Sequence, residues 1–300
     1  MRIVYWGNVK NTPHPTADGE ILKALKRVAD VQFFDIKQFD MGKLISGSNE
    51  ADLFLFHGQV PTSDEVTSML MVERIQVVLQ AIKCKKVMWF MEKVWLGKGN
   101  IVEKLLPEVD YAFFTDGTWV RRVKEKVHFL PTASPMKPLR GKYRTDLACD
   151  IAYVGQMYGP RTQEYEFLKE HFGDGIKCFN DKFGQDFADL CVSAKVMVVP
   201  RFPFDDFFWS DRIYQMLACG AFVVHQRAYG LKEEGFRDGV HYFEYERDQD
   251  FMALMESVFE KGMEKMRKNI AKTGKFFVKG HTYLERVQTL LKICEVESVK

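Results

Sequence analysis

The chain has 300 residues, of which 46 % are hydrophobic and 28 % charged, a balance that allows a large core and excludes a wholly disordered or fibrous protein. Its length is about twice that of a typical domain, so two domains are expected. With 43 basic and 41 acidic residues the formal net charge is only +2, which does not by itself indicate a nucleic-acid-binding protein.

The six cysteines and the first residues indicate where the protein works. The cysteines form no CxxC pair and most lie in apolar stretches, as buried thiols in a reducing compartment do. The chain begins with a strand-like segment instead of a leader peptide, and no apolar run approaches the roughly 20 residues that span a bilayer. A cytoplasmic protein without a membrane span is therefore expected.

Short apolar runs alternate with amphipathic stretches through the first 130 residues, the pattern of parallel βα units. Thr16 is expected to open a helix that presents Ile21 and Leu25 on its buried face. Thr62 and Glu65 have the spacing of a capping box for the next helix. The expected strands cover residues 2–6, 31–36, 52–57, 86–91, 110–114 and 127–130.

A stretch rich in proline and without periodicity, residues 131–148, is interpreted as a linker between two domains. A second series of expected strands follows, at residues 150–154, 176–179, 195–200, 221–225 and 241–245. Helices are expected from Arg161, from Ser210 to Cys219, from a cap at Asp248, from about Gly262 and from about Thr282. The chain therefore divides into an α/β domain over 1–135, a similar one over 149–280 and a helical segment over 281–300.

Ligands of open α/β sheets bind beyond the carboxyl ends of the strands, so the loops after strands are the first candidate sites. One such loop contains Gly155 and Gly159 and leads into the helix that begins at Arg161. Glycine lets the backbone approach a ligand, the helix N-terminus offers free N–H groups, and arginine adds charge for a diphosphate. The alternative is an ordinary turn with Pro160 in the first turn of the helix.

A second candidate loop, residues 200–209, is rich in aromatic residues and contains two acidic ones. It leads into a short helix that Ser210 or Asp211 caps and that Gly220 closes. Exposed aromatic side chains in such a loop suit stacking on a base, a sugar or another domain. The alternative is that they cover the sheet.

Residues 211–224, Asp-Arg-Ile-Tyr-Gln-Met-Leu-Ala-Cys-Gly-Ala-Phe-Val-Val, resemble the Arg-x-Phe-Glu-x-x-Ala-x-Gly-Gly motif of CgeB-type glycosyltransferases, which have the two-Rossmann GT-B fold. Further motifs of that family resemble the segment from Asp150 to Gly155 with Arg161, the pair Gly230-Leu231 with Phe236-x-x-Gly239, and Gly280-His281-Thr282-Tyr283-x-x-Arg286. The resemblance is good over residues 150–290 and loose over 1–130.

The resemblance implies two Rossmann-like domains that face each other across a cleft, with the C-terminal helix returning to the first domain. The first domain would bind an acceptor and the second a nucleotide sugar, with a UDP-sugar expected and no other cofactor. The implied donor-binding residues are Gly155, Arg161, Arg201, Asp211, Arg212, Tyr214 and Gln215. The family usually has Glu in place of Gln215, and an amide can accept one hydrogen bond and donate another where a carboxylate would accept two ribose hydroxyls.

No metal ion is expected. The sequence Asp248-Gln249-Asp250 is formally a DxD motif, but it lies at the start of a predicted helix. Capping by Asp248 and an interaction of Asp250 with the helix dipole explain it better than a cation does. Arginines and helix N-termini are expected to stabilise the leaving diphosphate instead, and the candidates are Arg161, Arg201 and Arg212.

Transfer with inversion needs a group that takes the proton of the acceptor hydroxyl, whereas retention by front-side attack can use the leaving phosphate. The candidate bases are Glu92 in first place, then Asp116 and His57, and also His14. Each of these residues also suits an ordinary loop hydrogen bond. Gly7 and Asn8, after the first strand, are expected to line the same site.

The leading hypothesis is metal-independent transfer of a hexose from a nucleotide sugar to a hydroxyl acceptor, which is a saccharide, a protein, a small molecule or modified DNA. One alternative is a phage-type enzyme that glycosylates hydroxymethylated pyrimidines in DNA, with the basic segments 121–126 and 137–144 on phosphates. These segments also suit a solvated surface. The other alternative is a non-catalytic nucleotide-sugar-binding relative, for which only Gln215 argues.

Overall fold

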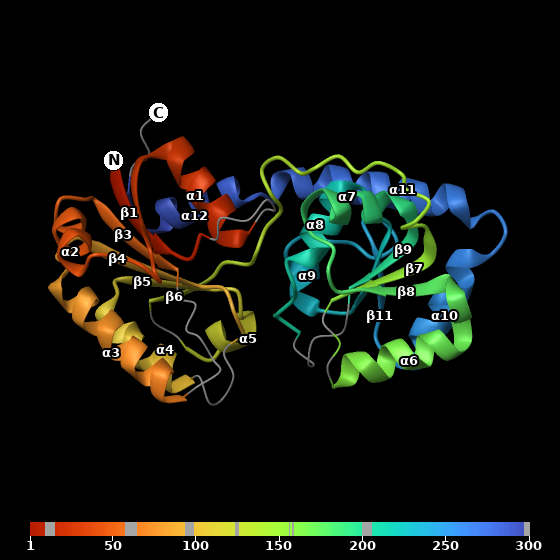
Figure 1. The fold of residues 1–300 in the computed structure, drawn as a ribbon, viewed down its shortest axis with the longest axis horizontal. Coiled ribbons are helices and arrows are strands. Elements are labelled where there is room, and N and C mark those ends of the chain that lie inside the picture. The colour runs from red at the N-terminus through yellow and green to blue at the C-terminus, as the bar shows by residue number, and fades with distance from the viewer. Residues whose placement is uncertain are drawn as a thin grey trace. The chain divides into compact units, whose positions relative to one another are not determined.

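The structure is a computed structural model that describes residues 1–9, 16–57, 65–93, 99–123, 126–155, 157, 159–199 and 206–296. The chain forms two compact units, the first made of Met1–Thr132 with Tyr283–Lys300 and the second of Ala133–Thr282. Each unit has a parallel sheet with helices on both faces (Figure 1). The predicted fold class, α/β with two Rossmann-like domains, is confirmed.

The sheet of the first unit has the strand order β2-β1-β3-β4-β5-β6. Its strands are β1 (Arg2–Gly7), β2 (Asp30–Asp35), β3 (Leu53–His57), β4 (Lys85–Phe90), β5 (Tyr111–Phe114) and β6 (Val127–Phe129). Its helices are α1 (Ala17–Val28), α2 (Met41–Asn49), α3 (Glu65–Ala81), α4 (Gly99–Leu105), α5 (Gly117–Val120) and α12 (Tyr283–Ile293), and Leu106–Glu108 form a 3₁₀ turn.

Side chains of the buried strands in the first unit alternate between two apolar layers, as the period of a strand requires. In β3, Phe54 and Phe56 belong to the core beneath α2, α3 and α4, whereas Leu55 and His57 lie on the opposite face. Helices α1 and α12 cover that opposite face (Figure 1). The C-terminal helix is thus part of the first unit, with Val287 and Leu290 fully buried.

The second unit repeats this arrangement with the strand order β8-β7-β9-β10-β11. Its strands are β7 (Cys149–Val154), β8 (Ile176–Phe179), β9 (Ala194–Val199), β10 (Val223–Gln226) and β11 (Phe243–Tyr245). Its helices are α6 (Pro160–Phe172), α7 (Gly184–Ser193), α8 (Arg212–Cys219), α9 (Tyr229–Glu233), α10 (Asp248–Phe259) and α11 (Met263–Phe277), with 3₁₀ turns at Gly173–Gly175 and Val278–Gly280.

All the predicted strands are present, and their ends differ from the predicted ones by at most two residues. The predicted start of α1 is confirmed, because the Thr16 side chain accepts a hydrogen bond from the Gly19 amide at 3.1 Å. The predicted cap of α10 is wrong by one residue. Arg247 is the N-cap, Asp248 is the first helical residue, and the Asp250 carboxylate accepts from the Arg247 amide at 3.2 Å. The predicted capping box at Thr62 lies outside the described residues.

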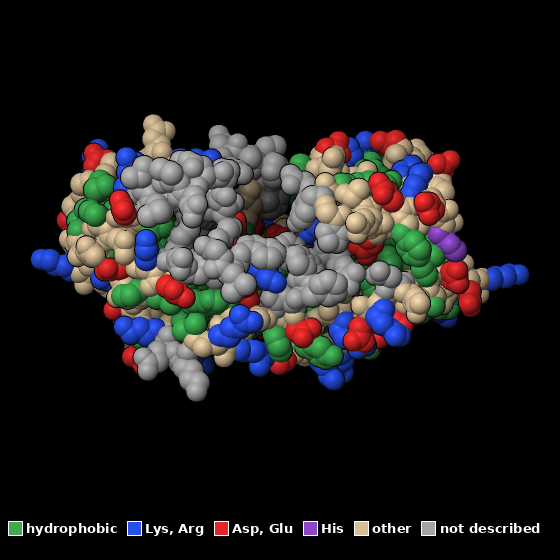
Figure 2. Space-filling model, turned by 90° about the horizontal axis from the view of Figure 1, so that it is seen from below, with side chains coloured by type: hydrophobic (Ala, Val, Ile, Leu, Met, Phe, Trp, Pro, Cys, Tyr) green, Lys and Arg blue, Asp and Glu red, His purple; other side chains and the backbone are tan. Residues whose placement is uncertain are grey.

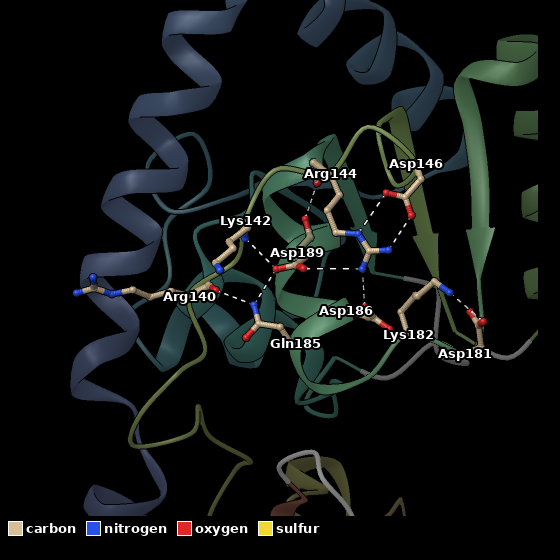
Figure 3. A network of polar contacts seen from close by, with 10 residues as sticks. Arg140, Lys142, Arg144, Asp146, Asp181, Lys182, Gln185, Asp186 and Asp189 are labelled. Atoms are coloured by element: carbon tan, nitrogen blue, oxygen red, sulfur yellow. Dashed lines mark hydrogen bonds and ion pairs between the residues drawn. The ribbon is translucent and has the colours of Figure 1, made fainter.

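The predicted linker is packed on the second unit rather than extended (Figure 3). The Lys142 amide donates to the buried carboxylate of Asp189 in α7 at 2.8 Å, and the Arg144 amide donates to Ser193 Oγ at 2.9 Å. The Arg144 guanidinium is paired with Asp146 at 2.7 Å and with Asp186 at 2.6 Å. The segment is therefore fixed by a network of polar contacts, and this network neutralises the charge of Arg144.

Candidate functional site

Both sheets have a topological switch point. At this point the next two strands along the chain lie on opposite sides of one strand. In the first unit β1 lies between β2 and β3, and in the second unit β7 lies between β8 and β9. Ligands of open α/β sheets bind beyond the carboxyl ends of the strands that meet at a switch point. The two candidate sites are therefore the ends of β1 and β3 and the ends of β7 and β9.

At the switch point of the second unit, β7 ends at Val154 and turns through Gly155, whose φ of +148° favours glycine. Helix α6 begins nearby, after Gly159, and carries a buried Arg161 in its first turn. Arg212, the first residue of α8, donates from Nη1 to the Val154 carbonyl oxygen at 2.9 Å. Three of the predicted donor-binding residues thus come together at the end of one strand.

Two further predicted donor-binding residues bind each other. Gln215 Nε2 donates to Asp211 Oδ2 at 2.6 Å, which uses one of the two N–H groups of the Gln215 amide. Burial raises the pKa of the Asp211 carboxyl above its ordinary value, although the Arg212 charge and hydrogen bonds oppose this.

The remaining predicted donor residues lie elsewhere or are not described. The Tyr214 side chain is fully buried, accepts from Trp209 Nε1 at 3.3 Å and packs edge-on against Phe236. These contacts hold α8 in place against Trp209 and Phe236. Any effect of Tyr214 on a donor would therefore act through the position of that helix. Arg201 and most of the aromatic loop lie outside the described residues.

A polar cluster that sequence analysis had missed lies beneath α6. The Glu164 carboxylate accepts from the Tyr153 hydroxyl at 2.8 Å and from the Tyr245 hydroxyl at 2.7 Å. Burial, and then the Glu164 charge, raise the pKa of Tyr153 far above its ordinary value, so this hydroxyl remains a donor. The cluster ties α6, and with it Arg161, to strands β7 and β11.

At the switch point of the first unit, three groups converge on one oxygen atom of Asp18 in the first turn of α1. The Tyr5 hydroxyl donates to Asp18 Oδ1 at 2.7 Å and the Asn8 amide at 3.0 Å. His57 Nδ1, at the end of β3, lies 2.5 Å from the same oxygen. Gly7 permits this approach, because a Cβ there would lie 2.6 Å from Asp18 Oδ1.

Burial alone would raise the pKa of Asp18, but the charge of His57 and hydrogen bonds from His57, Tyr5 and the Asn8 amide hold it below its ordinary value. Burial and the neighbouring Asp18 raise the pKa of Tyr5 far above its ordinary value, so Tyr5 acts as a donor. An ionised carboxylate only accepts, so the proton of the imidazole must lie on Nδ1.

Several buried polar atoms at the carboxyl edge of the first sheet have no hydrogen-bond partner within the described chain. They include His57 Nε2 after β3, Thr115 Oγ1 after β5 and Thr132 Oγ1 after β6. Buried polar atoms in folded proteins nearly always have a partner, so atoms without one that gather at one edge indicate a place for water or a ligand.

The other candidates in the first unit have local roles. Asp116 is buried and caps α5, where its carboxylate accepts from the Trp119 amide at 3.0 Å. Glu92 is half-buried just beyond β4. His14 lies outside the described residues. Of the three predicted bases that the structure describes, only His57 lies in a buried pair with a carboxylate, and its partner Asp18 was not identified by sequence analysis.

Within the described ranges, no three side chains of the types His, Cys, Asp and Glu lie close enough to hold a metal ion. The DxD carboxylate of Asp250 is paired instead with the Arg247 guanidinium at 3.0 Å. No helix among the described residues has the length and apolar character that crossing a membrane requires.

The second unit matches a known family in sequence. Residues 148–292, which contain the whole site at the end of β7, match the family described as glycosyl transferase-like. The second unit is thus similar in sequence to glycosyltransferases. No curated protein matches the chain in sequence.

Solved structures show that the whole chain has the GT-B fold. HepE from Anabaena, solved with UDP and glucose, has a TM-score of 0.65 at 11% identity, over 98% of this chain and 99% of that one. An α-glucosyltransferase solved with UDP and a DNA that contains an HMU base has a TM-score of 0.66 at 10% identity, over 98% and 99%. Sucrose-phosphate synthase from Thermosynechococcus elongatus has a TM-score of 0.63 at 10% identity, over 98% and 100%.

Proposed function

We propose that the glycosyltransferase moves a hexose from a UDP-sugar to a hydroxyl acceptor without a metal ion. The observation that carries the proposal is the agreement between the family match and the geometry of the second unit. The matched residues include the strand β7, its glycine turn and both arginines at its carboxyl end. The similar structures of HepE and of the α-glucosyltransferase contain UDP, which supports UDP as the nucleotide.

In this proposal the arginines and the start of α6 stabilise the diphosphate. Arg212 is held beside the diphosphate position by its hydrogen bond to the Val154 carbonyl, and Arg161 is held by the position of α6. Buried or half-buried guanidinium groups bind phosphate through several N–H groups at once. As the sugar leaves, the charge that develops on the diphosphate is stabilised without a cation.

Binding of UDP and UDP-glucose, measured by calorimetry, tests the donor site. We expect Arg212→Ala to weaken binding by about 10- to 100-fold, since a hydrogen bond to a charged group contributes about 1.5–3 kcal/mol. Arg237→Ala is the matched control, an exposed arginine of the same unit. Arg212→Lys keeps the charge and loses the fork of donors, so it should be intermediate. Equal effects of Arg212→Ala and Arg237→Ala would refute this donor site.

As the acceptor, we favour a small hydroxyl compound or saccharide over DNA. Arg144, within a basic segment considered for DNA, is already neutralised by Asp146 and Asp186. Figure 2 shows Lys and Arg mixed with Asp and Glu over the described surface of one face, without a patch of one sign. Phosphate-binding surfaces are instead strongly positive.

Incubation with UDP-glucose and a duplex that contains 5-hydroxymethylcytosine, followed by digestion to nucleosides and mass spectrometry, tests this choice. We expect no hexose increment. DNA affinity should also be weak, without the steep decrease of about 0.9 log units per phosphate for each tenfold increase in salt. A hexose on the base would establish DNA as the acceptor. Binding of UDP-glucose without any release of UDP would instead favour the third hypothesis, a non-catalytic relative.

A further inference from the structure

We propose that helix α11 docks the protein on an anionic phospholipid surface, where the lysines of its exposed face contact lipid phosphates and Phe276 enters the interface. No residue of α11 belongs to the candidate donor site, so this inference goes beyond the proposed function and does not depend on it. Three observations carry it: positive charge concentrated on one helix, a phenyl group exposed among the lysines, and the kind of basic residue that is exposed.

Positive charge is concentrated on α11 and the residues that flank it. Residues 260–279 contain seven basic and two acidic residues, a net charge of +5, whereas the whole chain has a net charge of only +2. The rest of the chain is therefore net negative. Within α11 the one acidic residue is Glu264, which forms an ion pair with Lys268. A chain that is close to neutral thus contains one strongly basic helix.

The exposed lysines share one face of α11, which lies along one edge of the second unit (Figure 1). The opposite face is buried, and a Cβ at Gly274 would lie 2.7 Å from Leu217 Cδ2, so the helix is seated directly on α8. Residues three, four or seven positions apart lie on one side of a helix. Exposed lysines with these spacings form the lysine stripe, which consists of Lys265, Lys268 and Lys272 of α11 and Lys279 of the 3₁₀ turn that follows it.

Phe276 lies within the lysine stripe, four residues after Lys272 and three before Lys279. It is 74% exposed, more than any other large hydrophobic residue that the structure describes, and Lys279 Nζ lies 5.4 Å from the centroid of its ring. Helices that lie in a membrane interface combine lysines with aromatic side chains in this way, whereas a solvated charged face needs no phenyl group. The backbone of DNA would offer phosphates to the lysines but no apolar surroundings to the ring. The combination therefore favours a lipid surface over a nucleic acid.

The basic residues of the stripe are all lysines. The one arginine of α11, Arg267, is half-buried, donates to the Val258 carbonyl oxygen and has its Cζ 5.6 Å from the ring centroid of Phe259. Arginine suits a fixed phosphate that parallel hydrogen bonds can reach, whereas lysine is a flexible point charge. A layer of mobile headgroups needs only the flexible charge. Groups of about four to eight basic residues on an amphipathic helix are typical of binding to anionic lipids.

Sedimentation of the full chain with lipid vesicles tests the proposal. One set of vesicles is phosphatidylcholine alone, and the other is phosphatidylcholine with phosphatidylglycerol in a ratio of about two to one. We expect the protein to bind the vesicles that contain phosphatidylglycerol and to remain in solution with the neutral ones. Binding should weaken as salt is added, because salt screens the attraction between exposed charges.

Two variants test the two parts of the surface. In the first, Lys265, Lys268 and Lys272 are all replaced by glutamine, which keeps a side chain that suits a helix. Each lysine near an anionic membrane contributes about fivefold to the partition coefficient, so this variant should bind about 100-fold more weakly. In the second, Phe276→Ser removes the apolar contact and should weaken binding by about tenfold. The part of the affinity that depends on Phe276 should be insensitive to salt.

The matched control changes the net charge by the same amount at a different place. It replaces Lys26, Lys37 and Lys43, three exposed lysines of the first unit, by glutamine. Its affinity for the vesicles should stay within about twofold of that of the unaltered protein, since lysines that are more than a Debye length of about 10 Å from the membrane are largely screened. The urea midpoint of every variant shows that it is folded, and calorimetry with UDP measures the donor site separately.

The outcomes separate this inference from the proposed function. Four results would overturn the inference: no binding to either kind of vesicle, equal binding to both, an equal loss in the two triple variants, or full affinity in Phe276→Ser. Duplex DNA that displaces the protein from the vesicles at an equal concentration of phosphate would assign the lysine stripe to a nucleic acid instead. A protein that binds anionic vesicles but not UDP would overturn the proposed function and leave the inference intact.

Discussion

Replacing Gly141 by alanine measures how tightly the segment after the first unit is packed on α7. An added Cβ would lie 2.0 Å from the Ala188 carbonyl oxygen, 2.7 Å from its carbon and 2.9 Å from Val192 Cγ2. Two of these atoms are backbone and cannot rotate away. Since Cβ contacts below 3.0 Å essentially do not occur, the segment must move by at least 1.0 Å, the difference between 3.0 and 2.0 Å.

Such a shift breaks the two hydrogen bonds beside the glycine. They are the Lys142 amide to Asp189 Oδ1 and Gln185 Nε2 to the Arg140 carbonyl, each 2.8 Å long. Overpacking costs about 1–3 kcal/mol, and each lost hydrogen bond about 0.5–1.5 kcal/mol. We therefore expect Gly141→Ala to lower the free energy of unfolding by about 2–6 kcal/mol.

Urea unfolding followed by circular dichroism measures this change. Gly280→Ala is the matched control, because a Cβ at Gly280 meets nothing within 4 Å and its φ is not in the left-handed region. It should leave the urea midpoint almost unchanged. A Gly141→Ala protein within about 0.5 kcal/mol of the Gly280→Ala protein would refute the reasoning, because such a difference is that of an ordinary surface substitution.

Three further predictions concern the C-terminal helix, acid stability and metal independence. Leu290→Ala should lower the free energy of unfolding by about 2–5 kcal/mol, because this side chain is fully buried. Replacing the exposed Lys292 by alanine should change it little. Equal effects of the two substitutions on urea unfolding would contradict the packing of α12 on the first unit. Burial lowers the pKa of His225 to about 4, whereas a histidine in the unfolded chain has a pKa of about 6.5. Between these two pH values the unfolded chain binds more protons than the folded one. The free energy of unfolding should therefore decrease as the pH falls from about 6.5 toward 4. His225→Gln should flatten this part of the pH dependence of the urea midpoint, and an unchanged slope would be inconsistent with it. Turnover of UDP-glucose should survive EDTA, and a loss that Mg²⁺ or Mn²⁺ restores would require a cation site.

The strands were predictable because both sheets are parallel and buried. Runs such as Val196–Val199 and Phe54–Phe56 are apolar on both faces, and this signal depends on the local sequence alone. The N-cap of α10 was predicted one residue too late, at Asp248 instead of Arg247. The ion pair of Arg247 with Asp250 fixes the start of the helix, and the sequence pattern alone does not show this pair.

The site was predictable only in part, because its decisive contacts join residues far apart in the chain. Arg212 was predicted from its motif, but its hydrogen bond to Val154 crosses 58 positions. Asp18 resembled any acidic residue in the first turn of a helix, and its partner His57 lies 39 positions away. The signal that identifies them is the strand order, which places the end of β3 beside the start of α1, and no local pattern contains it.

The division of the chain into units also determines the order in which they can be completed. The second unit is continuous and has all its residues once Thr282 has been synthesised. The first unit starts earlier but lacks α12 until Ile293 has been synthesised, so the surface that Val287 and Leu290 later cover stays open in the meantime. On the ribosome the half that starts first is therefore finished last. A stop codon between Thr282 and α12 would thus damage the first unit and leave the second unit whole.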